Sequence, residues 1–294
     1  MKLITFRQGP AARPGLAIDE NIGLDLLASD PSLPPRWSDI LPEPALMARV
    51  RRLGESARQQ GESRPACALF PLAGAQLLPP ITNPSKIIAV GLNYRDHAAE
   101  QGKPPPAAPV LFAKAPSCLQ GPYGPIVLDA GLDQVDAEAE LAVVIGRAGR
   151  AIPPAHAAEH IAGYMCFNDV SDRRAQYADK QWFRGKSLDT GGPCGPWLVT
   201  PDELTPLGAG LAVRALWNDT VMQDSNTSQL IFPVDELIAH ASRHMTLLPG
   251  DILSTGTPAG VGMYRQPQVF LKRGDTIVVE IEGIGRLVNP VITA

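Results

Sequence analysis

The most informative part of the sequence is Asp136-Ala137-Glu138-Ala139-Glu140, followed directly by the apolar run Leu141-Ala142-Val143-Val144-Ile145. In a β-strand, every second side chain points to the same face, so the three carboxylates are predicted to crowd together on one side. Burying unpaired carboxylates costs free energy. A hard divalent cation such as Mg²⁺, Mn²⁺ or Ca²⁺ relieves both the repulsion and the burial, because it prefers oxygen ligands. The alternative is a strand end with solvated acidic residues, and this segment alone does not decide between the two.

The composition of the whole chain is that of a globular protein with a real core. Of its 294 residues, 45% are hydrophobic and 19% are charged, which suits one large domain with an appendage, or two domains. The net charge of −4 gives no basic field for nucleic acid or acidic membranes. No apolar stretch reaches the roughly 18 residues of a membrane span. The apolar stretch at the start of the chain is also too short for a secretory signal. We therefore expect a cytoplasmic protein.

The cysteines at 67, 118, 166 and 194 contain no CxxC pair. Zinc binding and disulfides are therefore disfavoured, and packing roles are expected.

The chain divides into two predicted domains. Residues 1–75 read as a small N-terminal α+β domain, with short strands and an amphipathic helix over 43–60. Residues 76–84 form a proline-rich linker, and residues 85–294 form the catalytic domain. Strands without regular βαβ alternation dominate the second domain, so a doubly wound sheet is not expected. The predicted class is strand-rich α+β. Local patterns predict a strand over 135–145, a hairpin turn at Asn218-Asp219 and a short helix that stops at Gly102.

Four further motifs could carry chemistry. Asp169 ends an apolar strand and is a natural third metal ligand, although an aspartate there also suits a helix N-cap. His97 and Glu100 share one side of a helical turn, as a general base and its orienting carboxylate would, or they are a surface pair. Lys186, beside Gly185, could hold a substrate carboxylate or steady a developing enolate, or it is solvated. The turn 254–262, which includes Gly256, could cradle an anion or be purely structural.

Taken together, these motifs resemble the fumarylacetoacetate hydrolase family over residues 84–294, in a form with the short N-terminal domain of many bacterial members. The resemblance rests on ordered stretches of sequence: 90–94 (VGLNY), 96–97 with Glu100, 136–141, 168–171 (NDVS) with Gln176, 184–187 (RGKS) with 189–190, and 250–262.

The resemblance implies a mixed β-sandwich roll, expected as a homodimer, that binds a small 2-oxo acid. It implies Mg²⁺ or Mn²⁺ (Ca²⁺ in a crystal) held by Glu138, Glu140 and Asp169, with Asp136 in a supporting role. It further implies that His97 and Glu100 form a water-activating dyad on a mobile lid. The remaining candidates are Lys186 for catalysis and, for substrate binding, Gln176, Thr257, Gly256 and Arg95.

Three positions depart from the family's usual pattern and bear on the choice of substrate. Ala137 stands where many members carry an aromatic residue, Arg174 replaces a frequent aspartate, and Gly191 replaces a larger residue. The sequence from Gln181 to Thr200 most resembles that of the family branch that cleaves 2,4-diketo-3-deoxy sugar acids.

The leading hypothesis is hydrolysis of a carbon–carbon bond in a 3-acylpyruvate or related 2,4-dioxo acid. The metal would chelate the carboxylate and 2-oxo oxygens, and His97 would activate water for attack on the 4-carbonyl. Pyruvate would leave as an enolate stabilised by the metal and Lys186. The alternatives are a decarboxylase of an oxaloacetate-like acid or an isomerase of a hydroxydienedioate. A non-catalytic metal-dependent binding protein is a more remote reading.

Overall fold

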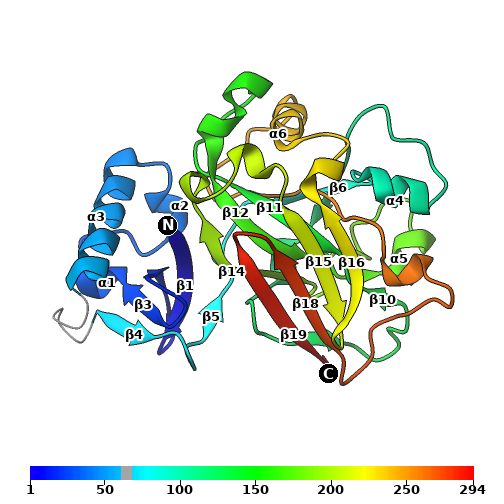
Figure 1. Ribbon diagram of the computed structural model, residues 1–294, viewed down its shortest axis with the longest axis horizontal. Helices are drawn as coiled ribbons and strands as arrows, with labels where there is room; N and C mark the ends of the chain where they lie inside the picture. The colour runs from blue at the N-terminus through cyan, green and yellow to red at the C-terminus, as the bar shows by residue number, and fades with distance from the viewer. Residues whose placement is uncertain (61–67) are drawn as a thin grey trace.

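The computed structural model describes residues 1–60 and 68–294 (Figure 1). Its larger sheet has the strand order β4-β3-β2-β1-β14-β12-β11-β17-β6-β7, with β5 beside β1 and β8 beside β14. Its twelve strands are β1 (Lys2–Gln8), β2 (Ala11–Ala17), β3 (Ile22–Asp25), β4 (Leu69–Pro71), β5 (Leu77–Leu78), β6 (Ile87–Gly91), β7 (Val110–Lys114), β8 (Leu119–Gln120), β11 (Ala139–Ile145), β12 (Ile161–Asn168), β14 (Gly192–Val199) and β17 (Ile252–Ser254).

A second sheet of five strands has the order β16-β15-β18-β19-β9 and lies in front of β11 and β12 in Figure 1. Its strands are β9 (Ile126–Leu128), β15 (Ala212–Trp217), β16 (Thr220–Asn226), β18 (Thr276–Ile281) and β19 (Gly285–Thr293). Two short strands, β10 (Val135–Asp136) and β13 (Ser171–Asp172), form a separate pair. Most pairings are antiparallel, but β17–β6, β14–β8 and β19–β9 are parallel, so the architecture is mixed.

Among the described residues, the α-helices other than the 17-residue α3 are short. The α-helices are α1 (Leu26–Ser29), α2 (Trp37–Ile40), α3 (Pro44–Gln60), α4 (Arg95–Glu100), α5 (Arg173–Ala178) and α6 (Val234–Ser242), with short 3₁₀ turns that include η4 (Pro201–Glu203), η6 (Thr227–Gln229) and η7 (Gly262–Tyr264).

The apolar run that follows the carboxylates is β11, and every one of its residues is buried. Leu141, Val143 and Ile145 belong to the core between the two sheets. Ala142 and Val144 face the opposite way and join a second core, which includes side chains of the N-terminal helices. A strand covered on both faces has no solvent side, so its sequence reads as a continuous apolar run rather than an alternating one.

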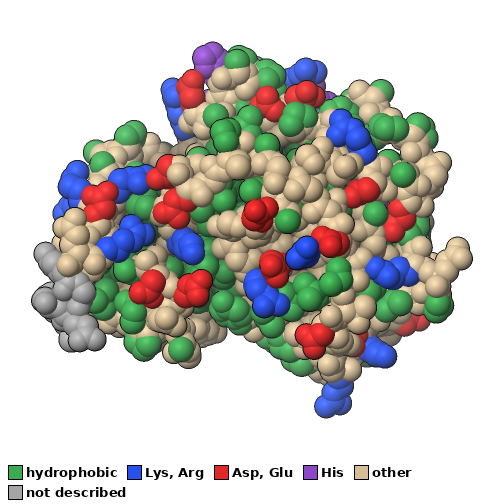
Figure 2. Space-filling model, viewed as in Figure 1, with side chains coloured by type: hydrophobic (Ala, Val, Ile, Leu, Met, Phe, Trp, Pro, Cys, Tyr) green, Lys and Arg blue, Asp and Glu red, His purple; other side chains and the backbone are tan. Residues whose placement is uncertain are grey.

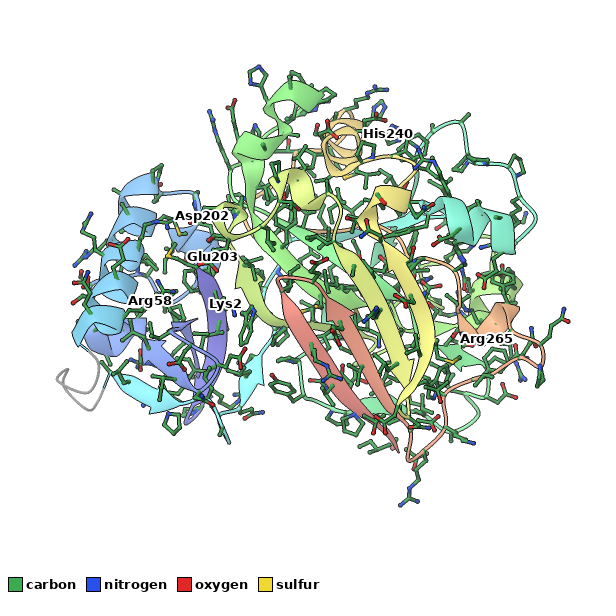
Figure 3. The ribbon with its side chains drawn as sticks, in the orientation of Figure 1. Lys2, Arg58, Asp202, Glu203, His240 and Arg265 are labelled. Carbon is green, nitrogen blue, oxygen red and sulfur yellow. The ribbon has the colours of Figure 1, made fainter. Side chains whose placement is uncertain are left out.

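The first strands continue the main sheet, because β1 pairs with β14 and Leu3 lies opposite Leu198. An exposed ion pair between Arg51 of α3 and Asp202 of η4 also crosses this junction, where Figure 3 labels Asp202. The division into an N-terminal domain, a linker and a catalytic domain stays a prediction.

The predicted strand over 135–145 is in fact interrupted. It divides into β10 and β11, because β10 pairs with β13 whereas β11 pairs with β12. Two other local predictions agree with the structure. The turn Asn218-Asp219 joins β15 to β16 with positive φ at both residues (49° and 67°), as a tight hairpin requires. Gly102, with φ of 62°, follows the end of α4.

Three predictions about the chain as a whole can be compared with the described residues. Cys118, Cys166 and Cys194 are buried, unpaired thiols, in keeping with packing roles, whereas Cys67 lies outside the described residues. Within residues 1–60 and 68–294, none of the helices has the length and apolar character needed to cross a bilayer. Acidic and basic side chains are interspersed on the face drawn in Figure 2, without a broad field of one sign.

Candidate metal centre and active site

Three buried carboxylates meet where two neighbouring strands end. Glu138 precedes β11, Glu140 lies within it, and Asp169 follows β12 directly. The pairing of Ala139 with Asn168 places these strand ends side by side. The amide N–H of Asp169 donates to the carbonyl of Glu138 at 2.9 Å, which fixes the junction. One oxygen from each carboxylate lies within 4.8 Å of the others. We call Glu138, Glu140 and Asp169 the carboxylate triad.

Two buried lysines neutralise part of the triad. The ammonium of Lys186 donates to Glu138 and Asp169, both at 2.7 Å. Lys114 donates to the other oxygen of Asp169 at 2.6 Å. Burial alone would lower the pKa of Lys186, but Asp169 and Glu138 raise it above its ordinary value. Lys186 therefore acts as a fixed positive charge.

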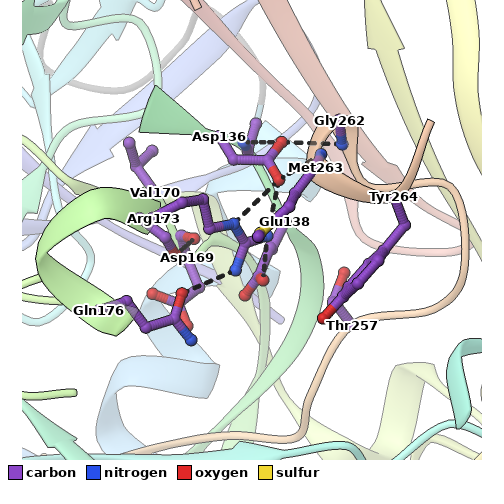
Figure 4. A network of polar contacts seen from close by, with 12 residues as sticks. Asp136, Glu138, Asp169, Val170, Arg173, Gln176, Thr257, Gly262, Met263 and Tyr264 are labelled. Carbon is purple, nitrogen blue, oxygen red and sulfur yellow. Dashed lines mark hydrogen bonds and ion pairs between the residues drawn. The ribbon is translucent and has the colours of Figure 1, made fainter. Parts of the chain in front are cut away.

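An arginine completes the neutralisation (Figure 4). The guanidinium of Arg173 pairs with Glu138 at 2.6 Å and with Asp136 at 2.7 Å, and it donates to Gln176 at 3.0 Å. Burial disfavours the charged form of Glu138, but Arg173 and Lys186 hold the pKa of Glu138 well below its usual range. Asp136 also accepts backbone N–H bonds from Gly262 and Met263. Asp136 thus anchors Arg173 and is not part of the triad.

Glu140 is the least compensated carboxylate. Its Oε2 accepts from the hydroxyl of Ser254 and from the N–H of Gly256, and both bonds fall on this one oxygen. Among the described residues, no ion pair to a lysine or arginine reaches Glu140. Burial, followed by the charges of Asp169 and Glu138, raises the pKa of Glu140 to about 8.

This donor set fits a hard divalent cation. Three carboxylates converge, and Oε1 of Glu140 has no hydrogen bond from any described residue. Each carboxylate offers about four lone-pair positions, so the bonds from Lys186, Lys114 and Arg173 do not exhaust the other two ligands. Glu138, Glu140 and Asp169 are therefore the residues that would hold Mg²⁺ or Mn²⁺.

A histidine and a glutamate come from α4. Nδ1 of His97 lies 2.8 Å from Oε2 of Glu100, and the N–H of Gly260 donates to the other oxygen of Glu100 at 2.8 Å. His97 is 6% exposed, and its ring packs edge-on against Tyr264 at 5.8 Å between centroids. A carboxylate held on one ring nitrogen leaves the other as a base.

A cavity of about 260 Å³ joins the base to the triad. Its polar wall includes His97, Glu138 and Glu140, and Lys186 also lines it. The rest of its lining includes Val90, Leu92, Gln101, Lys103, Val110, Phe112, Arg173, Gln176, Tyr177, Trp182, Thr257 and Tyr264. An imidazole, two of the three triad carboxylates and an ammonium thus line one cavity.

The remaining predicted substrate residues fall into two groups. Gln176 and Thr257 line the cavity. Gly256 instead supports Glu140 through its N–H; its φ of 98° favours glycine, and an added Cβ would lie 2.9 Å from Asn93. The side chain of Arg95 donates to the carbonyl of Leu230 at 2.6 Å and is not among the cavity residues. Substrate binding by these four residues stays a prediction.

Four residues of the site were not predicted as functional from the sequence: Lys114, Arg173, Gln101 and Tyr264. For Lys114 and Arg173 the sequence carries no local signal, because nothing in the neighbouring residues distinguishes a buried lysine or arginine from an exposed one. Gln101 did carry a signal: it lies four residues after His97 and therefore shares a helical face with it.

These features define the class of protein. Residues 86–292 match the family described as fumarylacetoacetate (FAA) hydrolase, C-terminal, and the chain belongs to the fumarylacetoacetate hydrolase family. Over 299 aligned residues it is 41% identical to the mitochondrial oxaloacetate tautomerase fahd2 of Xenopus laevis, covering 99% of this chain and 90% of that protein.

Two solved structures are similar along their whole length. The 5-carboxymethyl-2-hydroxymuconate delta-isomerase of Mycobacterium smegmatis has a TM-score of 0.77 at 36% identity, covering 100% of this chain and 99% of that one. The maleylpyruvate hydrolase of Sphingobium sp. SYK-6, in complex with manganese(II) ion and pyruvate, has a TM-score of 0.76 at 32% identity, with both chains covered completely. The predicted strand-rich α+β fold and family are confirmed, and the family's members include tautomerases, isomerases and hydrolases that act on small molecules.

The raised pKa of Glu140 predicts a pH-dependent affinity for metal. Below about pH 8 the metal-free site binds a proton on Glu140, and a metal ion must displace it. The association constant for Mg²⁺ should therefore rise about tenfold per pH unit up to about pH 8 and then level off. Isothermal titration calorimetry in buffers of different ionisation enthalpy measures both the constant and the released proton. A constant that does not change between about pH 6 and 8 would contradict the prediction.

Replacing Asp136 should destabilise the fold. Asp136→Ala leaves the buried guanidinium of Arg173 without one of its two carboxylate partners, and it leaves three backbone N–H groups without an acceptor. The expected loss is about 3–5 kcal/mol of unfolding free energy, measured by urea denaturation. The matched control is Asp224→Ala, which breaks an exposed pair with Arg214 and should change the midpoint little. Equal effects of the two substitutions would refute the supporting role.

Proposed function

We propose that this protein is a metal-dependent enzyme that interconverts the keto and enol forms of a short 2-oxo dicarboxylic acid of the oxaloacetate type. The observation that carries the proposal is that His97, paired with Glu100, lines the same cavity as Glu138 and Glu140 of the carboxylate triad. One part moves a proton, and the other provides a site for a cation. The name of the Xenopus laevis relative, which aligns with 99% of this chain, supports the same chemistry.

The size and charge of the cavity support a short, anionic substrate. Its volume of about 260 Å³ is below the roughly 300–1,000 Å³ typical of pockets for drug-sized ligands. With Glu140 ionised, as metal binding requires, Asp136 and the triad carry four negative charges against the three positive charges of Lys114, Arg173 and Lys186. A bound dication would turn this excess of one negative charge into an excess of one positive charge, which favours an anionic ligand.

The chain's own residues would move a proton between the 2-oxygen and C3. Nε2 of His97 takes the proton from one position and returns it to the other, so no proton is gained or lost overall. Glu100 holds the ring and stabilises the imidazolium while it exists. The ammonium of Lys186 favours the negative charge that develops on the 2-oxygen. A divalent cation held by Glu138, Glu140 and Asp169 supplies a Lewis acid for that oxygen when it is bound.

Hydrolysis of a carbon–carbon bond in a 2,4-dioxo acid is the second candidate, and it is the leading hypothesis from the sequence. The same dyad supports it, because an oriented imidazole can take a proton from water as well as from carbon. The solved maleylpyruvate hydrolase, with manganese(II) and pyruvate bound, adds support.

Analysis of the products separates these reactions. The protein is incubated with oxaloacetate and with a panel of 3-acylpyruvates and diketo sugar acids, with Mg²⁺ or with chelator. Tautomerisation changes no mass, hydrolysis adds water and decarboxylation releases carbon dioxide. Faster decay of the enol absorbance of oxaloacetate, lost on chelation, is the expected result. Activity insensitive to chelator would contradict metal dependence.

His97→Ala should lower kcat by about 10²–10⁴ and leave Mg²⁺ affinity near the parent value, because the ring is not a ligand. The measurements are the tautomerase rate and a calorimetric metal titration. His156→Ala is a matched control, since His156 pairs with Glu159 at the same spacing and the same 2.8 Å distance but is exposed. Full activity of His97→Ala would exclude His97 as the base.

A further inference from the structure

A chain of hydrogen bonds runs from the cavity wall to the base. Nζ of Lys103 donates to Oε1 of Gln101 at 2.8 Å, and Nε2 of Gln101 lies 2.8 Å from Nε2 of His97. Nδ1 of His97 contacts Glu100, which in turn accepts from Gly260. Lys103, Gln101 and His97 all line the cavity.

The partners of His97 determine where its ring proton lies. An ionised Glu100 only accepts hydrogen bonds, so Nδ1 of His97 carries the hydrogen, and Nε2 has the lone pair. The Gln101 amide oxygen accepts from Lys103, so the amide nitrogen faces His97 and donates to that lone pair. A neutral imidazole has one lone pair, and a base cannot use it while the amide occupies it.

Lys103 differs from the other two cations on the cavity wall. Arg173 and Lys186 are each paired with buried carboxylates. Lys103 is exposed, and the structure gives its ammonium a neutral amide oxygen as a partner and no ion pair to any described carboxylate. Its charge is therefore available to an anionic group of a ligand.

We propose that Gln101 is a positioning residue that caps the base in the ligand-free site, and that Lys103 recognises the distal carboxylate of the substrate and releases the cap. Pairing of Lys103 with that carboxylate removes the donor from Oε1 of Gln101. The amide then turns away from His97, and Nε2 becomes free to take a proton. The enzyme would thus expose its base to dicarboxylic 2-oxo acids in preference to monocarboxylic ones.

The local backbone allows this movement. Gln101 is the residue at the C-terminal end of α4, and Gly102 follows it with φ of 62°. The Gln101 side chain is only partly buried, so it can change rotamer without disturbing the core. Glu100 keeps its bond from Gly260 throughout, so the ring of His97 stays oriented.

The substrate part of this inference rests on the proposed function, and its test compares two acids. Exchange of the C3 hydrogens in D₂O is followed by NMR for oxaloacetate and for 2-oxobutanoate, which lacks the distal carboxylate. Lys103→Met should raise KM for oxaloacetate roughly tenfold with kcat little changed. It should also raise kcat/KM for 2-oxobutanoate, because the substitution permanently removes the donor from Oε1 of Gln101. Gln101→Met, of similar size but unable to donate, should raise kcat/KM for 2-oxobutanoate roughly threefold to tenfold.

Non-additivity and control variants sharpen the comparison. The preference is the ratio of kcat/KM for oxaloacetate to kcat/KM for 2-oxobutanoate. In the double variant this ratio should fall no lower than in the single variant with the lower ratio, because both changes act on one hydrogen-bonded chain. Gln229→Met and Lys272→Met replace an exposed glutamine and an exposed lysine outside the cavity and should behave like the parent. An unchanged preference in both Gln101→Met and Lys103→Met overturns the proposal. Slower exchange of 2-oxobutanoate by Gln101→Met also overturns it.

A measurement independent of turnover tests the cap itself. Diethyl pyrocarbonate acylates the free lone pair of a neutral imidazole, and mass spectrometry reports modification of His97 against exposed His156 in the same sample. Gln101→Met should speed modification of His97 roughly threefold to tenfold, whereas an unchanged rate overturns the cap. Faster modification without exchange of either acid would support the cap and reject the proposed function.

Discussion

The structure depends on balancing charge in a buried site. Four carboxylates and three cations lie together with almost no exposure to solvent, where unpaired ions are costly. Lys114, Arg173 and Lys186 each bridge an acidic residue to another part of the chain. Glu140 has no ion pair among the described residues, and burial together with the charges of Asp169 and Glu138 raises its pKa. The three cations therefore offset most of the cost of burying the carboxylates. The site still lacks positive charge, which favours the binding of a metal cation.

The same constraint explains the layout of the strands. Glu138 and Glu140 lie at the start of β11, where the strand enters the doubly covered interior, and Asp169 follows the end of β12 beside them. Asp136 lies beyond the break between β10 and β11, so its carboxylate turns to Arg173 and to the backbone of η7. Of the three alternating acids in the sequence, two thus belong to the carboxylate triad and one anchors Arg173.

Local sequence patterns predicted the features that depend on neighbouring residues, but few of the contacts between residues far apart in the chain. The apolar run, the hairpin at Asn218-Asp219 and the His97–Glu100 pair all follow from neighbours along the chain. The bond from Lys114 to Asp169 spans 55 residues and that from Arg173 to Asp136 spans 37, and no periodicity marks either one. The break between β10 and β11 also escaped prediction, because alternation fits one long strand equally well and the competing partner β13 is a short, distant segment.

The site has two parts that belong to different elements, and this separation bears on how one fold supports several reactions. The carboxylate triad is fixed by the start of β11 and the end of β12, whereas His97, the proposed base, lies on α4, a helix of six residues joined to the sheet by loops. A cation at the triad would polarise the same carbonyl in every case. What the base can reach then decides the outcome: a C–H bond at Nε2 gives proton transfer, and a water molecule there gives hydrolysis. Residues that control access to Nε2 of His97, such as Gln101, can therefore change the reaction without any change in the ligands of the metal.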